Sequence, residues 1–160
     1  DFDDSIAEVY RRQPDAEIFS SFPGAGATLA PRLQAAMGND RNRFDSAQEV
    51  SQYSGIAPVT ERSGKKSWVH RRLACSRFVK QSFHEFAGQS IQQCAWARAF
   101  YDSKRACEMG HHAAVRALAH KWIRIIFRCW KDHVPYDEQK YMQSLKQKQP
   151  AWLTFMAVEA

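Results

Sequence analysis

The sequence lacks a long hydrophobic run, a closely spaced cysteine pair and an internal repeat. Its apolar stretches are far shorter than the roughly 18 residues that a membrane-spanning helix needs, which excludes a membrane span. No two of its four cysteines, Cys75, Cys94, Cys107 and Cys129, form a CxxC pair, so we expect no structural zinc site. Reduced, mostly buried thiols are typical of a cytosolic protein.

The composition shows no extreme that would indicate disorder or a fibrous protein. With 160 residues, of which 44% are hydrophobic and 25% charged, the chain fits one globular domain with a tail. It begins Asp1-Phe2-Asp3-Asp4, without a Met and without a basic and apolar leader. We therefore expect a piece of a longer protein.

Charge is distributed unevenly along the chain. The net charge is +6, but residues 1–17 carry six acids and two arginines, so the remainder is strongly basic. Residues 61–80 hold seven basic residues against one acid, Glu61. Such a local excess favours a polyanion such as nucleic acid, and a solvated basic face is an equally good explanation.

Helical patterns cover most of the chain and predict a mainly α, compact helical domain. We assign residues 1–18 to an acidic linker or the end of an upstream helix, 19–140 to the domain and 141–160 to a tail. Ser46 and Glu49 have the spacing of a capping box at the start of a short helix. The other expected helices cover residues 29–37, 72–88, 94–108 and 111–131, with a break near 88–93.

The expected helix over 111–131 separates into an apolar and a basic side at 100° per residue. The apolar side should supply the core through Val115, Leu118, Trp122, Ile125 and Ile126. We interpret the basic side as a solvated face, with phosphate contact as the less favoured alternative. Its members are Arg116, His120, Lys121, Arg124, Arg128 and Lys131.

A glycine-rich turn, Phe22-Pro23-Gly24-Ala25-Gly26, precedes the first of these helices and has the pattern of a helix-hairpin-helix. Glycines adopt backbone conformations closed to other residues and let amide groups approach a phosphate, and a helix N-terminus adds positive potential. A nucleotide P-loop is excluded, because no Lys-Ser/Thr follows at the required spacing. Gly24 and Gly26 are therefore candidate nucleic-acid contacts, and an ordinary tight turn is the alternative.

Residues 59–71 form a polar, basic loop or a loose hairpin that contains Ser63 beside Gly64. Cations around this serine could hold a phosphodiester and stabilise charge on its oxygens. The candidates are Arg62, Lys65, Lys66, Arg71 and Arg72. A serine hydroxyl is a weak nucleophile without a base or metal, and taken alone a Ser-Gly pair is far more often a turn.

The order of the motifs is more informative than any one of them. Phe22-Pro23-Gly24-x-Gly26 is followed by Arg43-Phe44, then by Tyr53 to Pro58 with the sequence YSGIAP, then by Ser63-Gly64. This order resembles the C-terminal domain of the insertion-sequence 110/116/902 transposase family, over roughly residues 20–140. One departure is Cys75, which stands where the family has a glycine.

The resemblance implies a DNA-binding C-terminal domain of a transposase or recombinase. In it Ser63 would be the nucleophile that joins covalently to DNA, in a composite active site with a RuvC-like domain. It also implies Mg²⁺ held by that domain, DNA and a guide RNA as partners, homo-oligomers, and a bacterial cytoplasmic, nucleoid-associated location. This chain contains no acidic set of the RuvC type, so we expect no metal or other cofactor in it.

Two alternatives remain open at the level of sequence. One is a non-catalytic helix-hairpin-helix module that binds nucleic acid without any role for Ser63. The other is an interaction domain whose basic faces only keep it soluble, which would show negligible salt-dependent affinity for DNA.

We expect the chain by itself to bind DNA or RNA weakly and without sequence preference, and not to cleave or recombine DNA. The reason is that a serine without an activating base or metal is a poor nucleophile. The measurement is strand cleavage of labelled DNA with added divalent metal. Cleavage above the level of a Ser63→Ala control would contradict the prediction.

Overall fold

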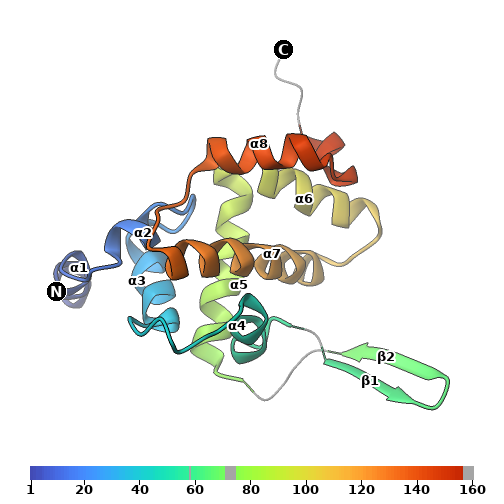
Figure 1. Ribbon diagram of the computed structural model, residues 1–160, viewed down its shortest axis with the longest axis horizontal. Helices are drawn as coiled ribbons and strands as arrows, with labels where there is room; N and C mark the ends of the chain where they lie inside the picture. The colour runs from blue at the N-terminus through green and yellow to red at the C-terminus, as the bar shows by residue number, and fades with distance from the viewer. Residues whose placement is uncertain (58, 71–74, 157–160) are drawn as a thin grey trace.

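The computed structural model describes residues 1–57, 59–70 and 75–156 and confirms the mainly α fold (Figure 1). None of the helices in this described part combines the length and apolar character needed to cross a bilayer. The elements are α1 (Phe2–Arg11), α2 (Ala16–Ser20), α3 (Gly26–Met37), α4 (Ala47–Tyr53), β1 (Val59–Ser63), β2 (Lys66–His70), α5 (Arg77–Gln93), α6 (Ala95–Ala106), α7 (His111–Asp132), α8 (Glu138–Lys148) and the 3₁₀-helix η1 (Ala151–Phe155).

The helices pack around α5 and α7, which cross in the middle of the molecule (Figure 1). Helix α3 packs on α5, α4 on α7, and α6 on both. Helix α8 and α6 lie along the top in this view, and the hairpin of β1 and β2 projects away from the helices at the lower right. The arrangement places the hairpin outside the helical core.

The core is centred on Trp122 of α7, which is fully buried. Its ring centroid lies 6.2 Å from Phe22, 5.1 Å from Phe86, 4.6 Å from Trp96 and 5.4 Å from Tyr136. These partners come from the turn before α3, from α5, from α6 and from the segment after α7. One side chain therefore joins four separate stretches of the chain, and aromatic pairs of this kind contribute beyond their buried area.

Four of the five predicted core residues of α7, including Trp122, are buried as expected, but Ile125 is only partly buried. The buried face of α7 also takes in Ile123 and Trp130. At 100° per residue, these positions shift the centre of the apolar face away from Ile125. The amphipathic pattern therefore predicted the buried face of α7 correctly but placed its centre too close to Ile125.

Helix α5 differs in part from the prediction, because Gly88 is helical and the chain runs unbroken to Gln93. The break lies at Cys94, an extended residue (φ −139°, ψ 117°) that ends α5 and precedes α6. A glycine inside a helix costs only about 1 kcal/mol. Packing of α5 against α3, α6 and α7 outweighs a cost of that size.

A buried ion pair holds the loop between α3 and α4 in place. The Asp15 carboxylate is 1% exposed and accepts hydrogen bonds of 2.6 Å from both terminal nitrogens of Arg41. The Arg41 guanidinium also lies 5.0 Å from the centroid of the Trp130 ring. Lys131 donates to the carbonyls of Arg41 and Phe44, at 2.5 and 3.2 Å. The loop is thus tied both to the start of α2 and to α7.

The apolar segment that forms η1 (Ala151–Phe155) packs on α6. Trp152 meets Phe100 edge-on, with 5.6 Å between the ring centroids and 88° between the planes. Helix α8 was not expected from the sequence, whose polar character there gave a weak pattern. Asp137 caps this helix by accepting from the Lys140 amide.

Replacing Ser90 with alanine should lower the free energy of unfolding by about 1–3 kcal/mol, because it leaves a buried indole N–H without an acceptor. The Trp122 Nε1 donates to Ser90 Oγ at 2.8 Å, and Ser90 itself donates to the Ala87 carbonyl. Urea denaturation measures the change.

Ser103→Ala is the matched control, since the Ser103 hydroxyl makes the same kind of bond, to the Phe100 carbonyl at 2.7 Å, but accepts none from an indole. We expect it to be close to neutral, because the helix propensity of alanine offsets a local hydrogen bond. Equal losses in the two variants would contradict the role given to the indole contact.

Candidate nucleic-acid interface

The basic segment around Ser63 is an antiparallel hairpin, one of the two forms predicted for it. Ser63, the last residue of β1, pairs with Lys66, the first of β2, so Gly64 and Lys65 form the turn. Gly64 has φ +60°, and two-residue hairpin turns need a positive φ at their first central position. The local chemistry of the sequence therefore accounts for the turn.

The turn of the hairpin carries positive charge into solvent. Lys65 and Lys66 are exposed, and the hairpin extends away from the helices (Figure 1). Arg62 lies in β1 opposite Ser67. The side chains of Arg62 and Ser63, and the whole of Arg71 and Arg72, lie outside the described part. The structure therefore places the backbone of Ser63 but not its hydroxyl.

The base of the hairpin depends on a glycine in the YSGIAP motif. Gly55 has φ +73°, and a Cβ at this position would overlap the Sγ of Cys75 and lie 2.8 Å from its Cβ. Residue 55 leads into the hairpin and residue 75 follows it, so this close approach joins its two ends. Cys75, the departure from the family pattern, is accommodated by the missing side chain of Gly55.

The two glycines of the predicted helix-hairpin-helix turn have different roles. Both have positive φ, +89° at Gly24 and +59° at Gly26. A Cβ on Gly24 would come within 3.0 Å of the backbone of Gln89 and Ser90 in α5, whereas a Cβ on Gly26 would meet nothing within 4 Å. Gly24 is therefore a packing residue, and Gly26 lies open to solvent at the start of α3.

The first turn of α3 leaves backbone donors exposed. Gly26, Ala27 and Thr28 are exposed, and Ala25 at the N-cap has no side chain that could accept a hydrogen bond. Amide groups in the first turn have no partner within the helix, and they attract anions. A phosphate bound at the turn would accept hydrogen bonds from these amides.

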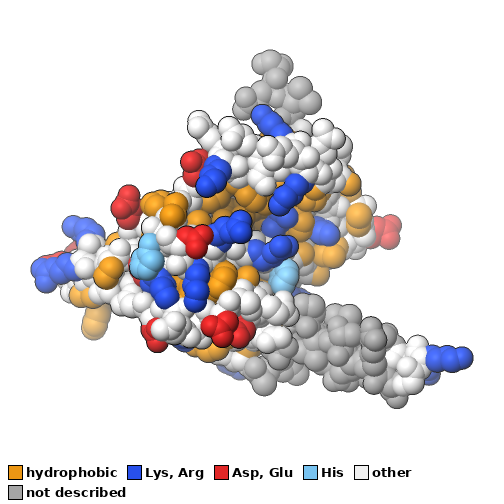
Figure 2. Space-filling view, in the orientation of Figure 1, with side chains coloured by type: hydrophobic (Ala, Val, Ile, Leu, Met, Phe, Trp, Pro, Cys, Tyr) orange, Lys and Arg blue, Asp and Glu red, His pale blue; other side chains and the backbone are white. Residues whose placement is uncertain are grey.

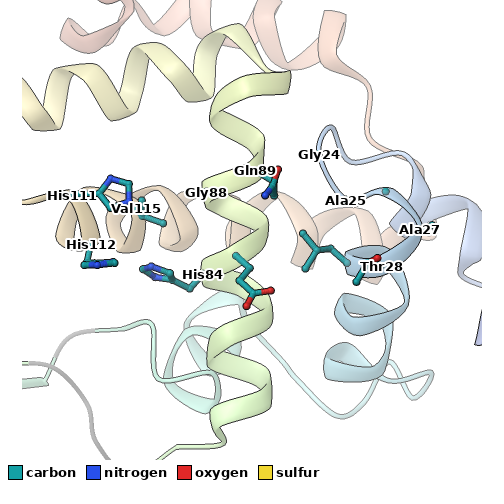
Figure 3. Close-up of a pocket in the computed structure, with 13 residues that line it drawn as sticks. Gly24, Ala25, Ala27, Thr28, His84, Gly88, Gln89, His111, His112 and Val115 are labelled. Atoms are coloured by element: carbon teal, nitrogen blue, oxygen red, sulfur yellow. The ribbon is translucent and has the colours of Figure 1, made fainter. Parts of the chain in front are cut away.

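The first turn of α3 lines a hollow of about 590 Å³ between α3, α5 and α7 (Figure 3). Three histidines line its far side: His84 from α5, and His111 and His112 from the start of α7. The His84 and His112 rings lie 5.7 Å apart, and the His111 ring lies 5.1 Å from that of His112. The hollow therefore combines amide donors with imidazole groups.

His84 favours its neutral form in this setting. Burial lowers the pKa of His84, and the positive charges of His112 and Arg116 lower it further. Tyr101 Oη and His111 Nδ1 are 2.7 Å apart and share a hydrogen bond. Glu85, which also lines the hollow, is paired with Arg32 at 2.7 Å, so its charge is partly compensated.

His84 was not among the residues singled out from the sequence. It lies 27 positions before His111, and only the packing of α5 on α7 brings the two together. Among the described residues, no group of three or more His, Cys, Asp or Glu side chains could hold a metal ion.

Comparison with known proteins places this sequence in a family. A family model described as the transposase IS116/IS110/IS902 family matches residues 16–102, from α2 into α6. The chain belongs to this transposase family. The matched region contains both the glycine-rich turn and the hairpin with Ser63, so the family assignment rests on the same segments that the sequence motifs had indicated.

Individual relatives support the IS116/IS110/IS902 assignment over most of the chain. A protein of the mini-circle IS117 from Streptomyces coelicolor is 32% identical over 89% of this chain. The 42 kDa protein of insertion element IS900 from Mycobacterium paratuberculosis is 34% identical over 85%, and the 44.8 kDa protein of IS116 from Streptomyces clavuligerus 28% over 82%. The chain spans 33–34% of the length of each of these relatives.

Alanine at Gly24 should destabilise the fold more than alanine at Gly26. Both substitutions force a left-handed φ on a residue with a Cβ, at a cost of about 1–2 kcal/mol. Only the Gly24 variant must also push the α5 backbone away. Chemical denaturation of Gly24→Ala and Gly26→Ala measures the difference, and a larger loss for Gly26→Ala would show that the close packing of the turn on α5 is misassigned.

Proposed function

We propose that this chain is the nucleic-acid-binding C-terminal domain of a transposase and that it presents Ser63 to DNA as the nucleophile. The observation that carries the proposal is the position of Ser63 at the end of β1, beside the turn of a hairpin that projects from the helices. A long substrate can approach a projecting hairpin without displacing the core. The family match covers this hairpin.

The surroundings of the turn suit a phosphodiester. Gly64 gives the neighbouring backbone little steric bulk, and the exposed Lys65 and Lys66 lie next to Ser63 in the chain. Cations close to a phosphate stabilise the negative charge that develops on its oxygens during attack. In the proposed step the Ser63 Oγ bonds to phosphorus, the bond from phosphorus to one sugar oxygen breaks, and that oxygen leaves as a hydroxyl.

The proton balance of this step requires a second group. The serine hydroxyl must give its proton to a base, and the leaving oxygen must gain one. We assign both tasks to a composite active site shared with a RuvC-like domain, which would also hold Mg²⁺. The matched part covers only 34% of each of two relatives, which leaves room in them for such a domain. A guide RNA, homo-oligomers and association with the bacterial nucleoid belong to the same proposal.

A second function is favoured by a separate observation. The exposed residues at the start of α3 line the same hollow as the histidines, which suits a helix-hairpin-helix module that only binds nucleic acid. In that case Gly26 would contact the backbone of the nucleic acid and Ser63 would be a turn residue. The two functions differ in what happens when Ser63 loses its hydroxyl.

Ser63→Ala in the full-length transposase should abolish recombination, with nucleic-acid binding unchanged, because the hydroxyl acts in the chemical step and not in binding. Recombination of a plasmid substrate and binding of labelled DNA are the two measurements. Ser67→Ala is the matched control, since Ser67 lies in β2 of the same hairpin, and it should retain activity. Recombination by the Ser63→Ala variant would leave the binding module as the better account.

A further inference from the structure

Four cations converge on the surface formed by α6, α7 and α8: Lys104, Lys121, Arg124 and Lys148, here called the α7 cation cluster. Burial lowers the pKa of Lys121, and the positive charges of Arg124, Lys148 and Lys104 lower it further. Figure 2 shows Lys and Arg side chains gathered over α7 and beneath α8. Residues far apart in the sequence thus share one strongly positive surface.

Aromatic rings hold two of these cations in position. The Lys121 ammonium lies 5.2 Å from the centroid of Phe100 and 5.1 Å from that of Trp152. The Lys104 ammonium lies 5.2 Å from the same Phe100 ring. Phe100 is buried, and η1 holds Trp152 against it. These lysines are therefore more restricted than ordinary surface lysines, whose charged ends extend freely into water.

The cluster carries no compensating negative charge in the part of the chain that the structure describes. None of its four side chains forms a hydrogen bond or an ion pair there, whereas cations elsewhere, such as Arg32, Arg41 and Arg98, are paired with carboxylates. Like charges held close together at a partly buried site repel one another. The sequence pattern favoured a solvated face on α7. Such a face does not require four cations from three helices to lie close together without a carboxylate between them.

We propose that the α7 cation cluster binds the phosphate backbone of a nucleic-acid strand, at a surface separate from the hairpin and the glycine-rich turn. A strand carries a row of phosphates, so it can satisfy several cations at once. The exposed Arg124 can hold a phosphate with two parallel hydrogen bonds, and each lysine supplies a point charge. The proposal rests on the proposed function only for the class of ligand, a nucleic acid, and not for the chemistry of Ser63.

The experiment removes the two exposed members of the cluster in the double variant Arg124→Gln/Lys148→Gln. Fluorescence anisotropy measures its affinity for labelled duplex DNA and for single-stranded RNA across a series of salt concentrations. Losing two phosphate contacts should reduce the slope of log K against log salt by about 1.8 for duplex DNA or about 1.4 for a single strand. The ligand whose slope falls by the full expected amount, duplex DNA or single-stranded RNA, is the form of nucleic acid that the cluster binds.

Two further variants make the result specific. Arg11→Gln/Arg12→Gln, here called the α1 control, removes the same charge from two exposed positions, the last residue of α1 and its C-cap, and should change the slope much less. Lys65→Gln/Lys66→Gln removes the described cations of the hairpin and reports on the proposed function. Circular dichroism and thermal melting confirm that all three variants are folded.

The outcomes separate the two proposals. An unchanged slope for the cluster variant, or a reduction equal to that of the α1 control, overturns the α7 cation cluster as a binding surface. If the hairpin variant alone binds more weakly, the cluster proposal fails while the proposed function stands. If the cluster variant alone binds more weakly, the cluster stands and nucleic-acid binding by the hairpin lysines fails. No salt-dependent binding by the unaltered chain overturns both.

Discussion

The packing of Trp122 is the interaction on which the rest of the structure depends. Its ring contacts side chains from the turn before α3, from α5, from α6 and from the segment after α7. Its indole N–H is satisfied by Ser90, so this fully buried side chain leaves no unpaired polar group. Four segments that are distant in the sequence are therefore fixed relative to one another by one residue, and the surfaces they carry are fixed with them.

Both candidate contact regions follow from this core. The glycine-rich turn lies directly against α5, because Gly24 has no side chain to hold the two backbones apart. Phe22, two residues earlier, reaches the Trp122 ring, which sets the position of the α3 N-terminus. The hairpin is different, since it projects from the helices and is joined to them at its base by the approach of Gly55 to Cys75. The glycine-rich turn is packed against α5, whereas the hairpin projects from the helices.

The positive charge of the chain is divided among surfaces that the sequence did not distinguish. The run of basic residues at 61–80 was evident, and part of it lies at the hairpin turn in Lys65 and Lys66. The basic stripe of α7 was also evident, but its pattern indicated only a solvated face. Lys104 and Lys148 could not be assigned to that stripe from spacing, because they come from α6 and α8. These two residues add positive charge beside Lys121, whose ammonium lies near the Phe100 and Trp152 rings.

The sequence by itself determined the features governed by local physical chemistry: the amphipathic face of α7, the Ser46 cap of α4, the end of α3 at Gly38 and the glycine at the hairpin turn. These depend on residues within one or two turns of each other. The ordered motifs also indicated the family. Only the tertiary structure decided that Gly88 stays helical, that Gly24 serves packing while Gly26 stays open, that His84 joins His112, and that four lysines and arginines share one surface. Those outcomes depend on which helices pack together, and long-range burial outweighs local preference where the two differ.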